Sequence, residues 1–432
     1  MIKPYNASIL LRPDACMSLT ERFATLTSLL HQHAVFWRHF PFREPVLSWA
    51  AQQPQLVREL LALADSDIEV FSTDAVALTG FFAPHLPFAT ELLQACTLPA
   101  LPSQPLPPIT PRLHAGIPGR KWQQIERFVA ALPQEYSRQQ NSEQQSSLQT
   151  SSLQKKLPVL EWCAGKSHLG FLLQHCSGQP VTALEWNAGL VAQANARALQ
   201  WQCDLHSHAV DVLSGAAEPF VQAQQQIVAL HACGDLHVRL LHLCVRQQVN
   251  QLQLSPCCYQ KIAAEHYQPL SQAARLHPLP LSKNELHIAV TETVTAGGYE
   301  RRQRLRLQAM RLGFDALQRA VRGVDEFLPV PSLPGEWARV DFRTLCEHCA
   351  HLKNLPLPAS IEWDFYEEKG WQRLREVSAL DLVRFLFRRP LEVWLVLDRA
   401  LFLQENGYRV RVGTFCERSA TPRNILIDAR HD

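Results

Sequence analysis

Ligand-capable side chains stand at the ends of short apolar runs in the middle of this chain. In the stretch 159–170 (VLEWCAGKSHLG), an apolar run reaches a carboxylate, passes through a turn of small residues and enters an amphipathic segment. A strand, a small-residue turn and a helix in this order open the nucleotide-binding βα unit of a Rossmann-like sheet. The chemistry to expect is therefore the binding of a nucleotide-containing cofactor, and the identity of that cofactor decides the function.

The residues of the turn favour S-adenosylmethionine (SAM) over a dinucleotide. A dinucleotide loop needs glycines at G-x-G-x-x-G spacing, but the third of these positions holds the bulky His168. A SAM loop follows the looser pattern acidic-x-G-x-G-x-G, which this chain meets with small residues and one true glycine. We expect cofactor contacts from four residues here: Glu161, Cys163, Gly165 and Ser167.

Four further βα units follow, and each strand ends in side chains that can bind a ligand. Glu185 ends the second apolar run and is placed to accept hydrogen bonds from both ribose hydroxyls. Asp211 ends the third run, where an acid commonly meets the adenine amino group, although it could instead cap the next helix. The fourth and fifth runs end in the strings HACGD (231–235) and SPCCY (255–259). An open α/β sheet gathers such residues into one crevice.

The strings HACGD and SPCCY are predicted to face the molecule that accepts the methyl group of SAM. His231 is also predicted to contact the cofactor. The predicted catalytic residues are His231, Cys233, Asp235, Cys257, Cys258 and Tyr259. Enzymes that methylate base amino groups usually carry an Asn/Asp-Pro-Pro-Tyr-like clamp after strand four, and here a similar string comes one strand later. Pyrimidine C5 methylation in RNA instead needs a thiolate to attack C6, with a histidine or acid handling protons. The alternative is that these cysteines only line the pocket.

A metal site is a second use for thiols. The string CEHCAH (346–351) holds one C-x-x-C pair with two histidines inside a predicted helix, and Cys257 and Cys258 could add ligands. Zinc sites usually need two such pairs at suitable spacing. We therefore assign no metal ligand from the sequence.

The chain divides into five predicted segments. Residues 1–113 are a helical N-terminal domain with a proline-rich end, and 114–157 hold a basic and aromatic helix followed by a Gln/Ser-rich linker. Residues 158–259 form the SAM-binding core. Residues 260–378 form a mostly helical insertion, with a capping-box start at 282–285. Residues 379–432 supply a last helix, interrupted at Pro390, and a terminal β-hairpin.

This arrangement predicts an α/β fold with a Rossmann-like class I methyltransferase sheet. Such a sheet has seven strands, of which the last runs antiparallel to the others, and the strand patterns at 408–415 and 424–429 supply the final hairpin. NAD-binding domains usually lack this ending, which also argues against a dinucleotide.

Four strings carry a resemblance to a known family: EWCAGK (161–166), ALHACGDL (229–236), PCCY (256–259) and TPRN (421–424). Over residues 114–432 the chain resembles bacterial methyltransferase-domain proteins related to the glutathione-S-transferase-C-terminal-domain-containing protein. More distantly, it is similar to methyltransferase-like proteins with a ribosomal-RNA-adenine-dimethylase-type domain. The resemblance implies SAM binding and leaves the acceptor open. Relatives often have glycine where this chain has Ser167.

Charge and composition narrow the partners. A formal net charge of +2 is too small to indicate nucleic-acid binding by itself, and we see no DNA-binding signal. Local basic clusters do exist: Arg120 and Lys121 beside Trp122, predicted to bind substrate or cover the SAM pocket, and a run of arginines at 301–322. A solvated helix face is the simpler interpretation of that run.

Function and location follow as expectations. We expect a SAM-dependent methyltransferase whose methyl acceptor is a macromolecule, and RNA is favoured over protein. The alternatives are a small-molecule methyltransferase and a catalytically silent SAM-fold module. No apolar run of about 18 residues is present for a membrane span, and the N-terminus (MIKPYN) does not read as a signal peptide. Twelve cysteines without framework spacing indicate reduced thiols in the cytoplasm.

Overall fold

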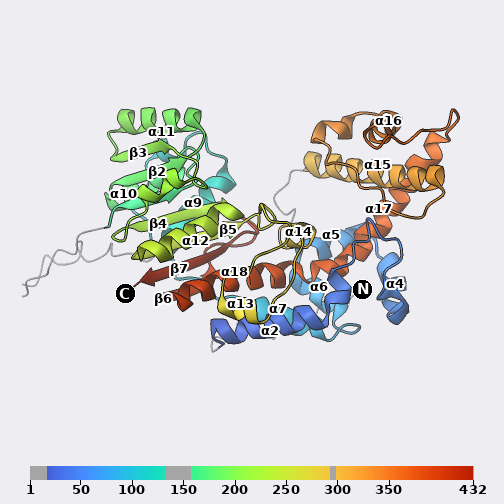
Figure 1. Ribbon diagram of the computed structural model, residues 1–432, viewed down its shortest axis with the longest axis horizontal. Coiled ribbons are helices and arrows are strands. Elements are labelled where there is room, and N and C mark those ends of the chain that lie inside the picture. Colours follow the sequence, from blue (N-terminus) through green and yellow to red (C-terminus); the bar gives the residue numbers. More distant parts are fainter. Residues whose placement is uncertain (1–16, 133–156, 292–297, 432) are drawn as a thin grey trace, which may run out of the picture. The chain divides into compact units, whose positions relative to one another are not determined.

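The computed structural model describes residues 17–132, 157–291 and 298–431. The predicted linker at 134–156 and the N-terminal hexapeptide discussed above lie outside the described residues. Within these ranges, helices accompany one seven-stranded sheet (Figure 1). None of the helices described is long and apolar enough to cross a membrane.

The sheet has the strand order β3-β2-β1-β4-β5-β7-β6. Its strands are β1 (Val159–Trp162), β2 (Val181–Glu185), β3 (Leu205–Ala209), β4 (Gln226–Cys233), β5 (Gln251–Cys257), β6 (Tyr408–Thr414) and β7 (Ile425–His431). Strands β1 to β5 pair in parallel, whereas β7 runs antiparallel to both of its neighbours, β5 and β6. This topology confirms the predicted Rossmann-like class I methyltransferase sheet.

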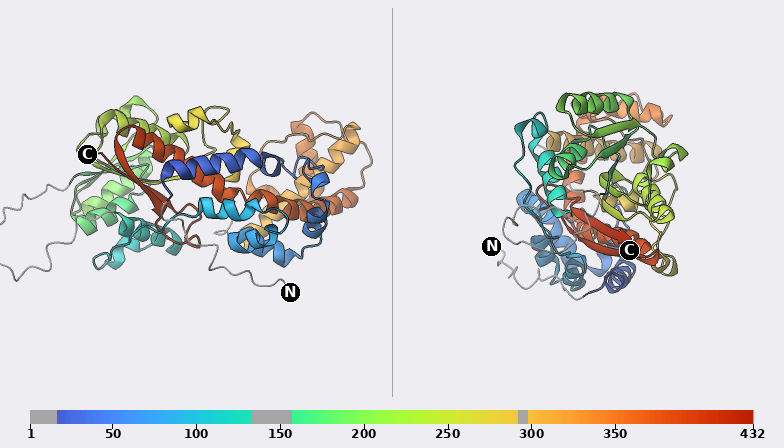
Figure 2. Two further views of the ribbon diagram at one scale, coloured as in Figure 1. Left: turned by 90° about the horizontal axis from the view of Figure 1, so that it is seen from below. Right: turned by 90° about the vertical axis from the view of Figure 1, so that its left-hand side faces the viewer.

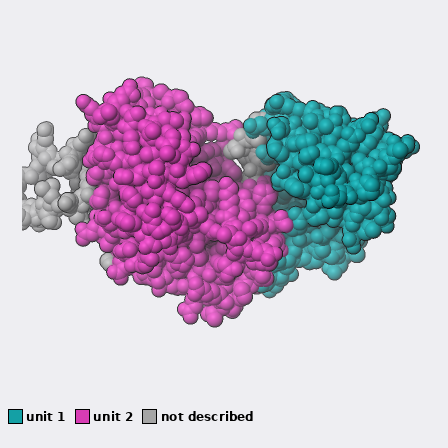
Figure 3. All heavy atoms as spheres, turned by 45° about the horizontal axis from the view of Figure 1, so that its top comes forward, with its two compact units in different colours: residues 1–11, 29–94, 292–388 teal, residues 12–28, 95–291, 389–432 magenta. Residues whose placement is uncertain are grey.

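The described chain divides into two compact units, each discontinuous in sequence (Figure 3). Unit 1 contains residues 29–94 and 298–388, and unit 2 contains 17–28, 95–132, 157–291 and 389–431. The sheet and every predicted cofactor or catalytic residue belong to unit 2.

Helices link and flank the strands of unit 2. They are α8 (Pro111–His114), α9 (Gly119–Ala131), α10 (His168–Ser177), α11 (Ala188–Trp201), η2 (Gly215–Phe220), α12 (Asp235–Gln247), α13 (Gln272–Leu276), α14 (Lys283–Ile288) and α18 (Arg388–Glu405), whose first residue falls in unit 1. Helices α9 and α10 share an apolar cluster with β1, centred on Phe128, Leu172 and Val159. The hairpin β6–β7 completes the sheet beside β5, although α13 to α18 separate them in sequence (Figure 2).

Unit 1 is helical in its described part. Its elements are α3 (Ala34–Trp37), η1 (Ala50–Gln52), α4 (Pro54–Leu61), α5 (Asp65–Thr73), α6 (Ala75–Phe82), α15 (Gly298–Arg322), η3 (Gly335–Arg339), α16 (Phe342–Leu352) and α17 (Trp363–Phe385). Two further helices contribute residues to both units: α2 (Leu19–Gln32) and α7 (Phe88–Cys96).

Two local predictions have clear outcomes. The capping box is confirmed: Ser282 Oγ accepts from the Glu285 amide, and the Glu285 carboxylate accepts from the Ser282 amide. The predicted helix break at Pro390 is wrong, because the break lies at 386–387, between α17 and α18. Pro390 sits instead in the first turn of α18, where a backbone N–H has no intrahelical partner to lose.

Candidate cofactor and methyl-acceptor site

The turn after β1 is held in an unusual backbone conformation. Cys163 and Ser167 have φ angles of 58° and 54°, in the left-handed region that non-glycine residues rarely adopt. At Gly165 (φ 59°), a Cβ atom would meet nothing within 4 Å, so the turn leaves open space above its backbone. The hydroxyl of Ser167 is buried beside the Glu161 carboxyl, whose pKa it lowers. The open space at Gly165 leaves room for the methionine end of a SAM molecule.

Glu161 lies beneath this turn. Its side chain is buried, and its Oε2 accepts a hydrogen bond from the Gly170 amide at 3.1 Å. A Cβ at position 170 would lie 2.6 Å from that oxygen, so only glycine allows the approach. Burial raises the pKa of Glu161 to about 8, an effect that the Gly170 hydrogen bond partly opposes. The carboxyl group is thus protonated near neutral pH until a cation approaches it.

Glu185 joins the turn to the end of β2. Its Oε2 accepts from the Gly165 amide at 2.9 Å, and its Oε1 accepts from the Asn187 amide at 3.0 Å. Each carboxylate oxygen keeps a further lone pair for a ligand hydroxyl. Trp186, the next residue, exposes 77% of its surface beside this carboxylate. Sequence reasoning missed Trp186, and the available signal was its position directly after Glu185.

Three predicted acidic residues act electrostatically on Cys163. Burial is the largest cause that raises the pKa of the Cys163 thiol to about 12, and Glu185, Cys233, Glu161 and Asp211 contribute to the same shift. Asp211 also accepts a hydrogen bond from the Leu213 amide at 3.0 Å, so it ends β3 in a local turn. The tertiary structure therefore brings together acids from the ends of β1, β2 and β3.

His231 lies at an irregularity in β4. The pairing of β4 with β5 shifts register between Leu230 and Ala232, and His231 has a φ of 63°. Such a bulge re-aims a side chain at the end of a strand. Burial lowers the pKa of His231 to about 4, so the ring is neutral near pH 7.

Gln124 of α9 fixes the His231 ring. Gln124 Nε2 donates to Ala420 O at 2.8 Å, which leaves its Oε1 to accept from His231 Nε2 at 2.9 Å. This assignment puts the imidazole proton on Nε2. Nδ1 then keeps its lone pair, and no described residue donates to it. Sequence gave no signal for Gln124, which is an ordinary residue of an amphipathic helix.

Three cysteine sulfurs meet at the ends of β4 and β5. The Sγ atoms of Cys233 and Cys257 lie 3.4 Å apart, and with Cys258 they form a group whose sulfurs all lie within 4.8 Å of one another. The thiols of Cys233 and Cys257 hydrogen-bond to Cys258 and lower its pKa to about 2. The same contacts raise the pKa of the buried Cys257. Of these three thiols, Cys258 is therefore the one whose pKa the group lowers, and Cys257 is buried with a raised pKa.

Two residues of the predicted catalytic set hold the backbone of this region. Asp235 Oδ2 accepts from the Ala263 amide at 2.7 Å, which fixes the turn after β5. Tyr259 is fully buried, and its hydroxyl donates to Pro256 O at 3.4 Å. The prediction that Tyr259 faces the acceptor is therefore wrong: its ring packs inward, against His237 and Arg399.

A buried polar network supports the end of β4 from α12 and α18. His237 Nδ1 donates to Ala232 O at 2.9 Å, and its Nε2 accepts from Arg399 at 2.7 Å. Arg399 also donates to Tyr267 Oη at 3.1 Å, and Tyr267 donates in turn to Asp398. Since each of these groups has a partner, the network can be buried without the penalty of an unpaired charge.

The three residues Arg120, Lys121 and Trp122 at the start of α9 differ in their exposure to solvent. Arg120 and Lys121 are exposed, and the charge of Lys121 acts on Glu161 and His231. Trp122 is 9% exposed and belongs to the apolar cluster of α9 and α10. The predicted role of Trp122 in substrate contact is therefore wrong, because its ring is part of the core.

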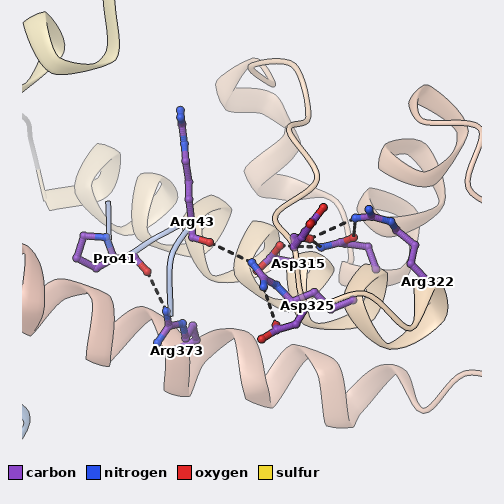
Figure 4. Close-up of polar contacts among 9 residues, drawn as sticks. Pro41, Arg43, Asp315, Arg322, Asp325 and Arg373 are labelled. Atoms are coloured by element: carbon purple, nitrogen blue, oxygen red, sulfur yellow. Dashed lines mark hydrogen bonds and ion pairs between the residues drawn. The ribbon is translucent and has the colours of Figure 1, made fainter. Parts of the chain in front are cut away.

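The arginine run of α15 forms contacts inside unit 1 (Figure 4). Arg319 pairs with Asp315 at 2.9 Å and Asp325 at 2.7 Å and donates to Arg43 O. Arg322 donates to Gln318 at 2.7 Å. Three more arginines of the run are also engaged: Arg301, Arg306 and Arg311. These contacts join α15 to the rest of unit 1, so most arginines of the run already have partners within the protein.

The C-x-x-C pair of α16 is structural as well. Cys346 and Cys349 are 0% and 1% exposed and lie in an apolar cluster with Phe314 and Leu345 of unit 1. His348 stacks on Trp337.

A comparison with known protein families agrees with the geometry. Residues 120–265 match the family model described as a methyltransferase domain. The matched range begins at the N-terminus of α9 and ends just beyond the three cysteines, so it contains the whole candidate site. Over residues 120–265, which include strands β1 to β5 of the Rossmann-like sheet, this chain is therefore similar to a methyltransferase domain.

Proposed function

We propose that this domain transfers the methyl group of SAM to a macromolecular acceptor, with RNA ahead of protein. The observation that carries the SAM assignment is the joint placement of Gly165 and Glu185. The turn that leaves room for the methionine end donates its Gly165 amide to the carboxylate at the end of β2. The hydrogen bond between the Gly165 amide and Glu185 thus connects the positions expected for the methionine and ribose parts of SAM.

Each part of SAM has a matching group in the chain. The buried Ser167 hydroxyl and the Glu161 carboxyl suit the amino acid end, with the Lys121 ammonium available to its carboxylate. Glu185 suits the ribose diol, and the exposed Trp186 indole suits a face of the adenine. When bound, SAM supplies a sulfonium-activated methyl group.

The chain's own contribution to transfer is position and proton acceptance. The turn after β1 fixes one end of the cofactor, and His231 presents a neutral Nδ1 near the ends of β4 and β5. A neutral imidazole can take the proton that an N–H or O–H acceptor loses. For pyrimidine C5 the thiolate would have to be Cys258, since Cys257 is buried and protonated.

The preference for RNA rests on exposed positive charge on α9 and on the turn after β1. Arg120 and Lys121 are exposed at the start of α9, and Lys166 is exposed in the turn after β1. These cations suit a phosphate backbone. Most arginines of α15 do not support this preference, because they form contacts within unit 1. The resemblance to the glutathione-S-transferase-C-terminal-domain and ribosomal-RNA-dimethylase-type proteins remains part of this proposal.

The test is transfer of labelled methyl from SAM into extract of cells that lack this protein. The labelled extract is divided between RNase and protease treatment. We expect label that only RNase removes, and loss of that label with Glu185→Ala but not with the control Asp204→Ala, an exposed acid before β3. Label that only protease removes would move the assignment to a protein acceptor. Label confined to small molecules, or SAM binding without transfer, would overturn the macromolecular assignment.

A further inference from the structure

Three cysteines from two neighbouring strands share one point at the edge of the sheet. Cys233 and Cys257 are direct partners in the parallel pairing of β4 and β5, and their sulfurs lie 3.4 Å apart. The sulfur of Cys258 lies within 4.8 Å of both. Cys233 and Cys258 are only partly buried, so the group has access from solvent.

The backbone at Cys258 makes this convergence possible. In an extended strand, consecutive side chains point to opposite faces, so Cys257 and Cys258 would normally diverge. Cys258 instead has a φ of 46°, in the left-handed region, and its sulfur lies close to that of its neighbour. This conformation costs about 1–2 kcal/mol in a residue with a side chain.

The chain around Cys258 holds that conformation in place. The Lys261 amide donates to Cys258 O at 2.9 Å and closes a turn, and the Asp235 amide donates to Lys261 O at 3.0 Å. Gly234 approaches the same carbonyl so closely that a Cβ there would lie 1.8 Å from it. Contacts from the end of β4 thus fix a strained turn whose effect is to group three sulfurs.

We propose that Cys233, Cys257 and Cys258 bind one thiophilic metal ion, of which Zn²⁺ is the representative. Zinc–sulfur bonds of about 2.3 Å in a tetrahedral site place two sulfurs about 3.8 Å apart. The sulfurs of Cys233 and Cys257 are 3.4 Å apart, and all three sulfurs lie within 4.8 Å of one another, so the observed separations are close to this value. Among the described residues, this group is the one whose ligand atoms come close enough to share an ion.

Three protein ligands leave a fourth position open. His231 Nε2 is already occupied by Gln124, so a water molecule or an acceptor atom would complete the coordination. The group lies at the carboxyl ends of β4 and β5, at the same edge of the sheet as the turn after β1. This metal site goes beyond the proposed methyl transfer and does not depend on it.

Cobalt titration of the full-length reduced protein tests the site. After chelator treatment and dialysis under anaerobic conditions, Co²⁺ is added, and thiolate-to-cobalt charge-transfer absorption is recorded; Zn²⁺ is then added as competitor. We expect one Co²⁺ per chain, displaced by one Zn²⁺. Cys258→Ser should weaken binding by at least roughly 10-fold, because it removes one of three ligands. The matched control is Cys203→Ser, a half-buried cysteine outside the group.

A second readout keeps the test independent of folding and activity. In the wild-type protein, Zn²⁺ should protect Cys258 from alkylation by iodoacetamide while leaving Cys203 as reactive as before. Absence of thiolate-to-cobalt absorption, or alkylation of Cys258 at the same rate with and without Zn²⁺, would overturn the site. A disulfide between Cys233 and Cys257 in protein isolated under argon would also overturn it. Because no methyl transfer is measured, failure here says nothing against the methyltransferase proposal.

Discussion

The side-chain amide of Gln124 accepts a hydrogen bond from His231 Nε2 at 2.9 Å, which links α9 to the bulged end of β4. The amide is itself held by the Ala420 carbonyl, so the orientation of the imidazole depends on two segments far from it in sequence. This contact places the imidazole proton on Nε2 and leaves Nδ1 unprotonated.

Gln124→Ala is expected to lower kcat about 10-fold while leaving the dissociation constant of SAM unchanged. Without the amide, the ring can rotate and change tautomer, and a misplaced base loses part of the 10²–10⁴-fold contribution typical of general-base catalysis. Steady-state kinetics and SAM titration calorimetry separate the two effects. Gln123→Ala, the exposed neighbour on α9, is the control. Equal kcat values for both variants would show that His231 needs no positioning.

Glu161 should make SAM binding and stability depend on pH in opposite directions. Its pKa is about 8 in the folded chain, against about 4.5 when unfolded. As the pH rises from about 4.5 to about 8, Glu161 loses its proton in the unfolded chain but keeps it in the folded chain. The free energy of unfolding therefore decreases over this range, and the contribution of Glu161 that is present below pH 4.5 is lost by pH 8. Glu161→Gln should therefore gain Tm relative to wild type between pH 5 and pH 8 without cofactor.

SAM affinity supplies the complementary measurement. A cationic ligand favours the ionised carboxyl, so wild-type affinity should increase up to about tenfold per pH unit below pH 8. Glu161→Gln should remove this part of the pH dependence. Calorimetry in buffers of different ionisation enthalpy would detect the released proton, and equal proton release by both proteins would contradict the assignment to Glu161.

Trp186→Ala is expected to weaken SAM binding by roughly 2- to 10-fold. Aromatic stacking contributes about 0.5–1.5 kcal/mol beyond area burial, and this indole is 77% exposed without ligand. Quenching of tryptophan fluorescence by SAM should disappear in the variant. Trp371→Ala, which removes a 45% exposed tryptophan from α17, should change neither quantity. A Trp186→Ala protein with unchanged affinity would place the adenine elsewhere.

Gly234→Ala is expected to destabilise the fold by about 2–4 kcal/mol. The added Cβ would lie 1.8 Å from Lys261 O, and the φ of 50° is itself unfavourable for alanine. Chemical denaturation measures the loss. Gly215→Ala provides the comparison, because a Cβ there meets nothing within 4 Å, and its effect should stay within about 0.5 kcal/mol. Similar losses in both variants would mean that the turn at 258–261 can move.

The sequence by itself determined the sheet and the order of its ligand-bearing strand ends. Apolar runs that stop at Glu161, Glu185 and Asp211 are local patterns that can be recognised in the sequence. Because β1, β2 and β3 pair in parallel, the carboxyl ends of these strands lie at the same edge of the sheet. The capping box at Ser282 could be predicted for the same reason, since all of its partners lie within three residues.

Tertiary structure decided which side chains are available for chemistry. Trp122 and Tyr259 looked like ligand-facing aromatics, but partners far away in sequence bury them. The arginines of α15 looked like a basic surface, but acids and carbonyls of unit 1 engage most of them. Burial and pairing depend on contacts between distant segments, so neighbouring residue types cannot reveal them. The grouping of three cysteine sulfurs likewise needs the left-handed backbone of Cys258, which only the packed turn stabilises.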